Sequence, residues 1–207
     1  MGLFSSGSLA EILLRLPALL WALSFHEFCH GWVAYKLGDN TAALQGRLSI
    51  NPLDHLDPIG TLMLLFFPFG WAKPVPINSR NFRRPGRDIA LVSIAGAAGN
   101  LLTAFVCLAL IRFFPQLMRS GAIRSIMQNM LFINVGLGVF NLIPIPPLDG
   151  SKVLAVFLPP SMLSGYFFLE RYGMVIILIL VFTRVISSIM MPIIGLILNL
   201  FQLILFF

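Results

Sequence analysis

Residues 24–31 read SFHEFCHG and place the pattern His-Glu-x-x-His inside an otherwise apolar segment. Residues four apart on a helix lie one turn apart on the same face, so His26 and His30 have the spacing that binds one zinc ion. Glu27 follows His26 by about 100° of helix and lies beside the open position of such a metal. There it can accept a proton from bound water. The pattern predicts a helical zinc site with Glu27 as catalytic base; the alternative is two histidines that only pack in a helical core.

The composition is that of a membrane protein rather than a soluble domain. Of the 207 residues, 58% are hydrophobic and 11% are charged, whereas soluble domains have about 25% charged residues. Charged and histidine side chains are costly in a membrane, so their presence in an apolar segment indicates function. The net charge of +6 fits cytoplasmic loops and anionic lipid headgroups, and we expect no nucleic-acid partner. Cys29 and Cys107 lie in apolar segments and predict no disulfide framework.

The apolar runs predict an all-α polytopic membrane protein with one domain over residues 1–207 and about four transmembrane helices. The expected spans are 8–36, 89–114, 123–144 and 172–205. The last is either one long helix or two segments divided after Thr183-Arg184 or at Pro192. A shorter apolar run at 59–70 reaches only about 17 Å as a helix, which predicts a re-entrant element.

The segment between the first two spans is polar and rich in proline, which predicts a small β or extended region on the cytoplasmic side. Residues 41–44 and 47–50 are candidates for two short strands. Residues 71–78 contain Pro74 and Pro76, which suit an edge strand and a polyproline-like loop equally well. An exposed edge strand can pair with an extended peptide, so this segment is a candidate for substrate binding.

Four further polar residues are candidates for contact with a substrate or an oxyanion. They are Asn141, Asn100, His55 and Lys73. His55 lies between two X-Pro dipeptides and belongs either to a tight loop or to a third polar group near the metal. Asn100 and Asn141 lie in apolar segments, where a buried amide needs a partner from a neighbouring helix or from the site.

A zinc ion held by two histidines needs another protein ligand to form a hydrolytic site. The third expected span ends in the sequence PIPPLDG at residues 144–150, where three prolines break the helix. Asp149 follows this break. It is either the N-cap of the next segment, 150–159, or the third zinc ligand with an oxygen about 2.0–2.2 Å from the metal. Alongside the histidine pair, we favour the ligand.

Charge bias sets the expected orientation in the membrane. Seven lysine and arginine residues lie from Lys36 to Arg87, whereas the loop after the second span has Arg119 and Arg124. Residues 37–88 are therefore expected in the cytoplasm, with the N-terminus outside. The third span then brings Asp149 back to the side of the membrane on which the histidines lie.

Taken together, these motifs resemble the site-2 protease family of intramembrane zinc metalloproteases, the peptidase M50 type. The resemblance covers about residues 8–155 through the stretches 26–30, 51–58, 70–76, 95–100 and 141–150. The chain resembles the short bacterial branch without a PDZ or CBS domain. The resemblance implies one Zn²⁺ per chain held by His26, His30 and Asp149, with Glu27 as base. It also implies a multi-pass protein of the bacterial inner membrane whose active site faces the cytoplasm.

The expected function is hydrolysis of peptide bonds within or near transmembrane helices of membrane proteins, as in regulated intramembrane proteolysis. The alternative is a catalytically inactive, zinc-binding membrane scaffold that binds transmembrane helices without cleaving them. The expected partners are a transmembrane-helix substrate and membrane lipids. The sequence leaves the substrate's identity and the oligomeric state open.

Overall fold

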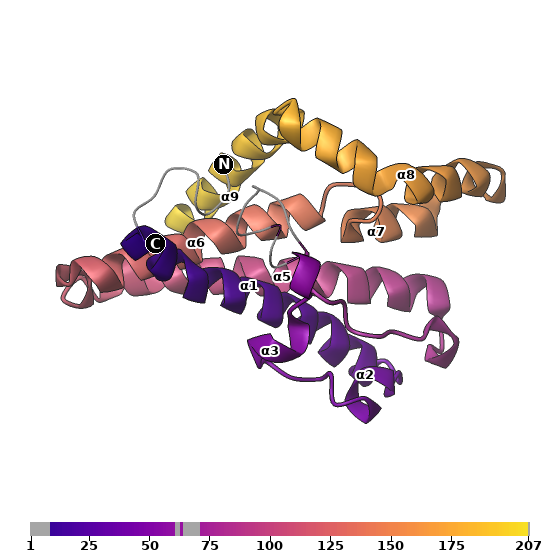
Figure 1. Cartoon of the computed structure of the whole chain (residues 1–207), viewed down its shortest axis with the longest axis horizontal. Helices are drawn as coiled ribbons and strands as arrows, with labels where there is room; N and C mark the ends of the chain where they lie inside the picture. Colours follow the sequence, from indigo (N-terminus) through magenta and orange to yellow (C-terminus); the bar gives the residue numbers. More distant parts are fainter. Residues whose placement is uncertain (1–8, 61–62, 64–70, 207) are drawn as a thin grey trace.

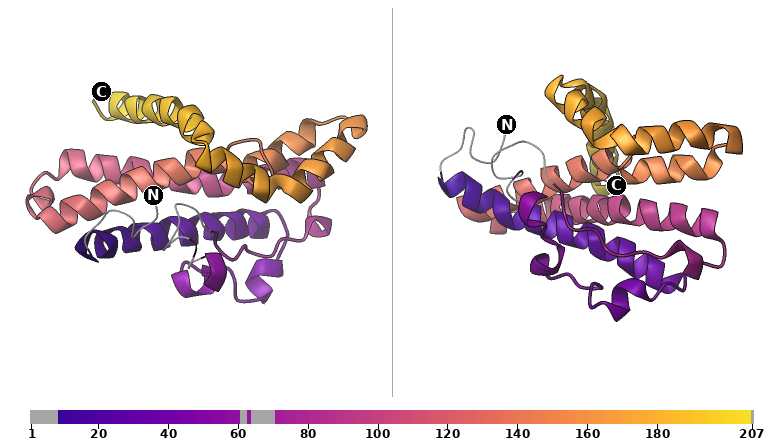
Figure 2. Two further views of the ribbon diagram at one scale, coloured as in Figure 1. Left: turned by 45° about the horizontal axis from the view of Figure 1, so that its top comes forward. Right: turned by 45° about the vertical axis from the view of Figure 1, so that its right-hand side comes forward.

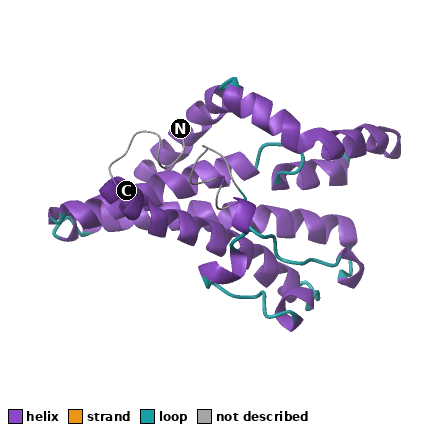
Figure 3. Ribbon diagram, in the orientation of Figure 1, coloured by secondary structure: helices purple, strands orange, loops and turns teal. Residues whose placement is uncertain are grey.

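The structure, a computed structural model, describes residues 9–60, 63 and 71–206. Its long helices are α1 (Leu9–Lys36), α5 (Pro85–Phe113), α6 (Gly121–Asn141), α8 (Leu163–Phe182) and α9 (Val185–Phe206). The short elements are α2 (Thr41–Leu44), α3 (Pro52–His55), η1 (Ser79–Asn81), η2 (Leu117–Arg119), α7 (Asp149–Phe157) and η3 (Pro160–Met162). The described residues form no strand (Figure 3), so the predicted all-α fold is confirmed.

Helices α1, α5 and α6 lie side by side along the long axis of the molecule (Figure 1). The two further views agree that α5 and α6 separate α1 from the α8–α9 pair (Figure 2). The short helices α2 and α3 lie on the outer side of α1. Helix α7 packs against α5, and this packing brings the chain after the proline break back to the three-helix bundle.

Within the described part of the chain, four helical segments are long and apolar enough to cross a membrane, which makes this a multi-span membrane protein. They are Pro85–Phe113, Gly121–Asn141, Pro160–Phe182 and Val185–Phe206. The first two correspond to the spans expected at 89–114 and 123–144. The span expected at 8–36 is a 28-residue helix, α1, about 42 Å long, but it is not one of these four.

The span expected at 172–205 is two helices rather than one. The chain turns at Thr183-Arg184, and Arg184 has a φ of 63°, a left-handed conformation that is uncommon for residues other than glycine. Pro192, the other candidate for a break, lies inside α9. Helix α8 also begins at Leu163, earlier than expected, because the interfacial segment before Tyr172 continues the same helix.

The β part of the region expected between residues 40 and 78 is wrong for the residues that the structure describes. Residues 41–44 form helix α2, because the Asp39 carboxylate accepts a hydrogen bond from Thr41 N at 3.1 Å and starts a turn there. Residues 71–78 are not helical and join no sheet; the only pairing among the described residues is an isolated antiparallel bridge between Leu56 and Ala72. The expected re-entrant element at 59–70 lies largely outside the described residues.

Glycines let α5 approach the histidines of α1. A Cβ atom at Gly96 would lie 2.5 Å from His30 Nε2 and 2.7 Å from His26 Nε2. A Cβ atom at Gly99 would overlap the sulfur of Cys29. Small residues at helix interfaces permit this close backbone approach, so the position of the histidine pair depends on the absence of a side chain on α5.

Candidate metal centre

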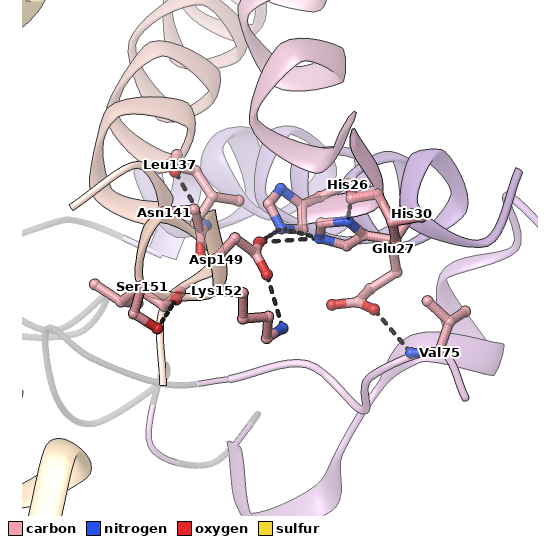
Figure 4. A network of polar contacts seen from close by, with 11 residues as sticks. His26, Glu27, His30, Val75, Leu137, Asn141, Asp149, Ser151 and Lys152 are labelled. Atoms are coloured by element: carbon pink, nitrogen blue, oxygen red, sulfur yellow. Dashed lines mark hydrogen bonds and ion pairs between the residues drawn. The ribbon is translucent and has the colours of Figure 1, made fainter. Parts of the chain in front are cut away.

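Two histidines and one aspartate from distant parts of the chain converge on one point (Figure 4). His26 Nε2 and His30 Nε2 lie 3.1 and 3.0 Å from Asp149 Oδ2, and the two nitrogens are 2.9 Å apart. All three residues are buried. In a tetrahedral zinc site with bonds of 2.0–2.1 Å, ligand atoms are about 3.3 Å apart, so this group needs to expand only slightly to bind zinc.

Asp149 reaches the histidines because a new helix begins at this residue. It is the first residue of α7, whose N-cap is Leu148, and no side chain caps this helix. Asp149 is therefore not the N-cap that the sequence offered as an alternative. Gly150 lets α7 begin against the end of α6, since a Cβ atom there would overlap the carbonyl oxygen of Leu142.

The hydrogen bond made by His30 indicates that a cation belongs between the histidines and the aspartate. Val92 O accepts a hydrogen bond from His30 Nδ1 at 2.7 Å; a carbonyl oxygen can only accept, so Nδ1 carries the proton. In the neutral ring, Nε2 then has only a lone pair, and it faces the Asp149 carboxylate oxygen at 3.0 Å. Two hydrogen-bond acceptors at this distance require a proton or a metal ion between them. The two histidines and the aspartate therefore fit as ligands of a zinc ion.

Lys152 holds the other oxygen of Asp149. Its Nζ atom donates to Oδ1 at 2.9 Å from one turn further along α7. The positive charge of Lys152 beside Oδ1 favours the ionised form of the Asp149 carboxylate, and a carboxylate must be ionised to serve as a metal ligand.

Glu27 lies beside the metal-binding group and faces the same cavity of about 400 Å³. Its Oε2 atom accepts a hydrogen bond from the backbone N–H of Val75 at 2.8 Å (Figure 4). The cavity is lined by His26, Glu27, His30, Pro74, Val75, Ile77, Ile89, Val92, Ser93, Asn141, Pro147, Asp149 and Lys152. A carboxylate therefore shares one cavity with the metal-binding side chains.

Only one of the four candidates for substrate contact lines this cavity, namely Asn141, whose Nδ2 donates to Leu137 O at 3.0 Å. Asn100 is completely buried in α5. His55 is also buried; its Nε2 donates to Ser49 O at 2.7 Å, and its carbonyl accepts from Lys73 N at 2.8 Å. The Lys73 side chain is exposed.

Several contributors to the cavity were not predicted from the sequence, and three of them bear polar groups that face it or bind its walls. Lys152 follows Asp149 by three residues, and this helical spacing is a signal that could have identified it. Ser93 lies three residues before Gly96 and is buried at the cavity wall. The third contributor is the backbone N–H of Val75, which no residue-type pattern reveals because every residue except proline has one.

Comparisons with known proteins identify the family of the chain. The family model described as "Peptidase family M50" matches residues 115–187, which include Asp149. "Putative zinc metalloprotease YwhC" of Bacillus subtilis is 38% identical over 183 residues, covering 86% of this chain and 84% of that protein. The chain belongs to peptidase family M50. This membership confirms the resemblance to site-2 proteases and places the chain among metalloproteases.

More distant relatives come from mycobacteria. "Putative zinc metalloprotease Rip2" of Mycolicibacterium smegmatis is 29% identical over 180 residues, covering 83% of this chain and 67% of that protein. The Rip2 protein of Mycobacterium tuberculosis H37Rv is 28% identical over 165 residues, covering 78% and 63%. No solved structure gives a significant match to the chain.

Proposed function

We propose that this M50 peptidase is an intramembrane zinc metalloprotease that hydrolyses peptide bonds within or near transmembrane helices of membrane proteins. The observation that carries the proposal is the convergence of His26, His30 and Asp149 on one point, with Glu27 on the same cavity. Two imidazoles and one carboxylate leave a fourth zinc position open, as in hydrolytic zinc sites. When bound there, one zinc ion per chain supplies Lewis acidity that polarises a peptide carbonyl and acidifies water.

Glu27 moves the proton in this mechanism. Its carboxylate accepts a proton from the attacking water and returns it to the nitrogen of the leaving amine. The Val75 N–H holds Oε2 at 2.8 Å, which fixes the carboxylate and leaves Oε1 to face the reacting atoms. Asn141 lines the same cavity, and its side chain hydrogen-bonds the substrate backbone or the developing oxyanion.

The substrate enters the cavity as an extended chain. A transmembrane helix satisfies its peptide groups internally, so it unwinds locally before its backbone reaches Glu27. Residues 71–78 supply one wall. The N–H of Lys73 already donates to His55, and Arg47 donates to the carbonyls of Lys73 and Pro74. Ile77 has neither its N–H nor its C=O in a hydrogen bond within the described chain, so it is the position where a substrate strand pairs.

The proposed location is the bacterial inner membrane, with the cavity open toward the cytoplasm. Helix α2 and the start of α5, which belong to the basic region of residues 36–87, lie near the end of α1 that carries the metal-binding group. The positive-inside rule assigns that end to the cytoplasm. Arginines of this segment also suit contact with anionic lipid headgroups.

A comparison of wild type with Glu27→Gln tests the proposal and excludes the inactive scaffold. Each purified protein is incubated in detergent with a panel of single-span membrane substrates, and zinc content is measured on the same samples. We expect cleavage by wild type only, with equal zinc in both proteins, because glutamine keeps the shape but cannot accept the proton. Glu170→Gln on α8, which is exposed, is the matched control and should cleave like wild type. Equal cleavage by the Glu27→Gln variant would overturn the mechanism, and binding without cleavage by wild type would favour the scaffold.

A further inference from the structure

The two histidines differ in the contact made by the ring nitrogen that points away from the metal-binding group. His30 Nδ1 donates to Val92 O at 2.7 Å. His26 Nδ1 is buried and has no hydrogen-bond partner among the described residues. Metal-binding histidines almost always donate their second ring N–H to a carboxylate, carbonyl or water, which fixes the tautomer and the ring orientation. His26 therefore needs a partner that direct contacts do not supply.

Asn100 is a second buried side chain that lacks a hydrogen-bond partner among the described residues. It is 0% exposed, and neither Nδ2 nor Oδ1 has a hydrogen-bond partner in the described part of the chain. An amide buried without a partner costs several kcal/mol in hydrocarbon surroundings. Asn100 does not line the cavity, so its partner is a group within the helix bundle rather than a substrate.

The packing of α1 against α5 brings the segments that carry these two groups side by side. The contacts run in opposite directions along the two helices: His30 meets Val92, His26 meets Gly96, and Trp21 meets Thr103. His26 Cε1 lies 2.6 Å from the position of a Cβ atom at Gly96, and Nδ1 is bonded to Cε1.

Asn100 lies one turn after Gly96, where residues four apart stack with Cβ atoms about 5–6 Å apart. Side chains on a helix lean toward its N-terminus. The Asn100 amide therefore leans toward Gly96 and the His26 ring.

We propose that Asn100 is the positioning residue for His26, with its Oδ1 accepting from the His26 Nδ1–H through one bridging water. Two hydrogen bonds through a water span about 5.5 Å between the end atoms. Buried waters occupy sites where several polar atoms lack partners, and His26 Nδ1, Asn100 Oδ1 and Asn100 Nδ2 supply three. This inference rests on the proposed zinc function. Asn100 thus has for His26 the role that the Val92 carbonyl has for His30.

The test is the zinc affinity of the full-length protein in detergent, measured by competition with a chromophoric chelator. Asn100→Ala should bind zinc about 10–100-fold more weakly than wild type, the usual effect of losing such a partner. Asn100→Asp should recover most of this loss, because carboxylates are common partners of zinc-binding histidines. A residue that serves only packing would not give this recovery.

Asn134→Ala on α6 is the matched control. Asn134 is likewise 0% exposed, and its Oδ1 also lacks a partner within the described residues. Its removal should change zinc affinity less than about threefold. The inference is overturned if Asn100→Ala and Asn134→Ala bind zinc equally well, or if Asn100→Asp binds no better than Asn100→Ala. Failure of wild type to bind zinc would instead reject the proposed function, so the two failures are distinguishable.

Discussion

The bundle of α1, α5 and α6 and the pair of α8 and α9 use apolar helices in opposite ways. In the most apolar stretch of α5, 39% of the residues are buried inside the protein, whereas in that of α9 none are. The bundle encloses polar side chains, among them His26, His30, Asn100 and Asn134. The α8–α9 pair buries only Gly173, Ile177 and Ile186. Buried polar groups, rather than hydrophobicity, therefore distinguish the site from the membrane-facing surface.

The two regions meet at the loop that carries Asp149. Ile177 and Ile186 pack against Ile143 and Leu148 in one buried apolar cluster. Gly173 approaches the same loop so closely that a Cβ atom there would overlap the carbonyl oxygen of Pro146. The α8–α9 pair thus packs against the loop that leads to Asp149 but contributes no metal ligand itself.

The largest effect that would sharpen this comparison is expected at Gly96. In Gly96→Val, the side chain would occupy the space of both histidine rings, so we expect zinc affinity to fall at least about 100-fold. The matched control is Gly195→Val in α9, where a Cβ atom meets nothing within 4 Å. Zinc affinity is measured by chelator competition. Similar affinities for the two variants would show that the bundle interface is not what positions the histidines.

A smaller effect is expected where the two regions meet. Gly173→Val should push the Pro146 carbonyl away and shift the loop before Asp149, lowering zinc affinity by roughly tenfold, on the scale expected for residues that support a ligand. Gly165→Val in the same helix has open space around its Cβ position and should leave affinity unchanged. If both variants bound zinc with wild-type affinity, α8 would have no influence on the site.

Residue chemistry and helical spacing predicted the central features of the site. The four-residue interval brought His26 and His30 together, and the proline break at 144–147 placed Asp149 where a helix begins. The turn at Thr183-Arg184 was one of two candidate break points, because the sequence is apolar on both sides and Arg184 adopts a left-handed φ although it is not glycine. The contact between Glu27 and Val75 N–H depends on backbone placement, which side-chain patterns do not encode.

The smallest effect on zinc is expected at Asp39, which lies outside both regions and fastens the 71–81 segment. Its carboxylate accepts hydrogen bonds from Thr41, from Asn78 N at 2.7 Å and from Asn81 Nδ2 at 2.7 Å. Asp39→Asn should lower the free energy needed to open this segment by about 2 kcal/mol, the worth of hydrogen bonds to a charged group. Zinc affinity should stay within about threefold of wild type. Hydrogen exchange of residues 71–81 measures the opening.

Asp39 also gives this segment a pH dependence. Burial raises the pKa of Asp39, but the hydrogen bonds from Thr41, Asn78 and Asn81 outweigh burial and hold it below its ordinary value. The stabilisation is therefore fully present above about pH 4, the ordinary value for aspartate, and is lost as the pH falls toward the lower folded pKa. Exchange, corrected for intrinsic rates, should accelerate over this acidic range in wild type. Equal acceleration in Asp39→Asn, which cannot ionise, would show that the Asp39 charge does not stabilise the segment.

Zinc analysis combined with X-ray absorption shows whether His26, His30 and Asp149 hold one zinc ion. Wild type should contain about one zinc per chain, with nitrogen and oxygen ligands at about 2.0–2.2 Å and no sulfur. Asp149→Ala should lose most of this zinc. A zinc-free wild type, a sulfur ligand from Cys29, or full zinc occupancy in Asp149→Ala at wild-type affinity would contradict the account.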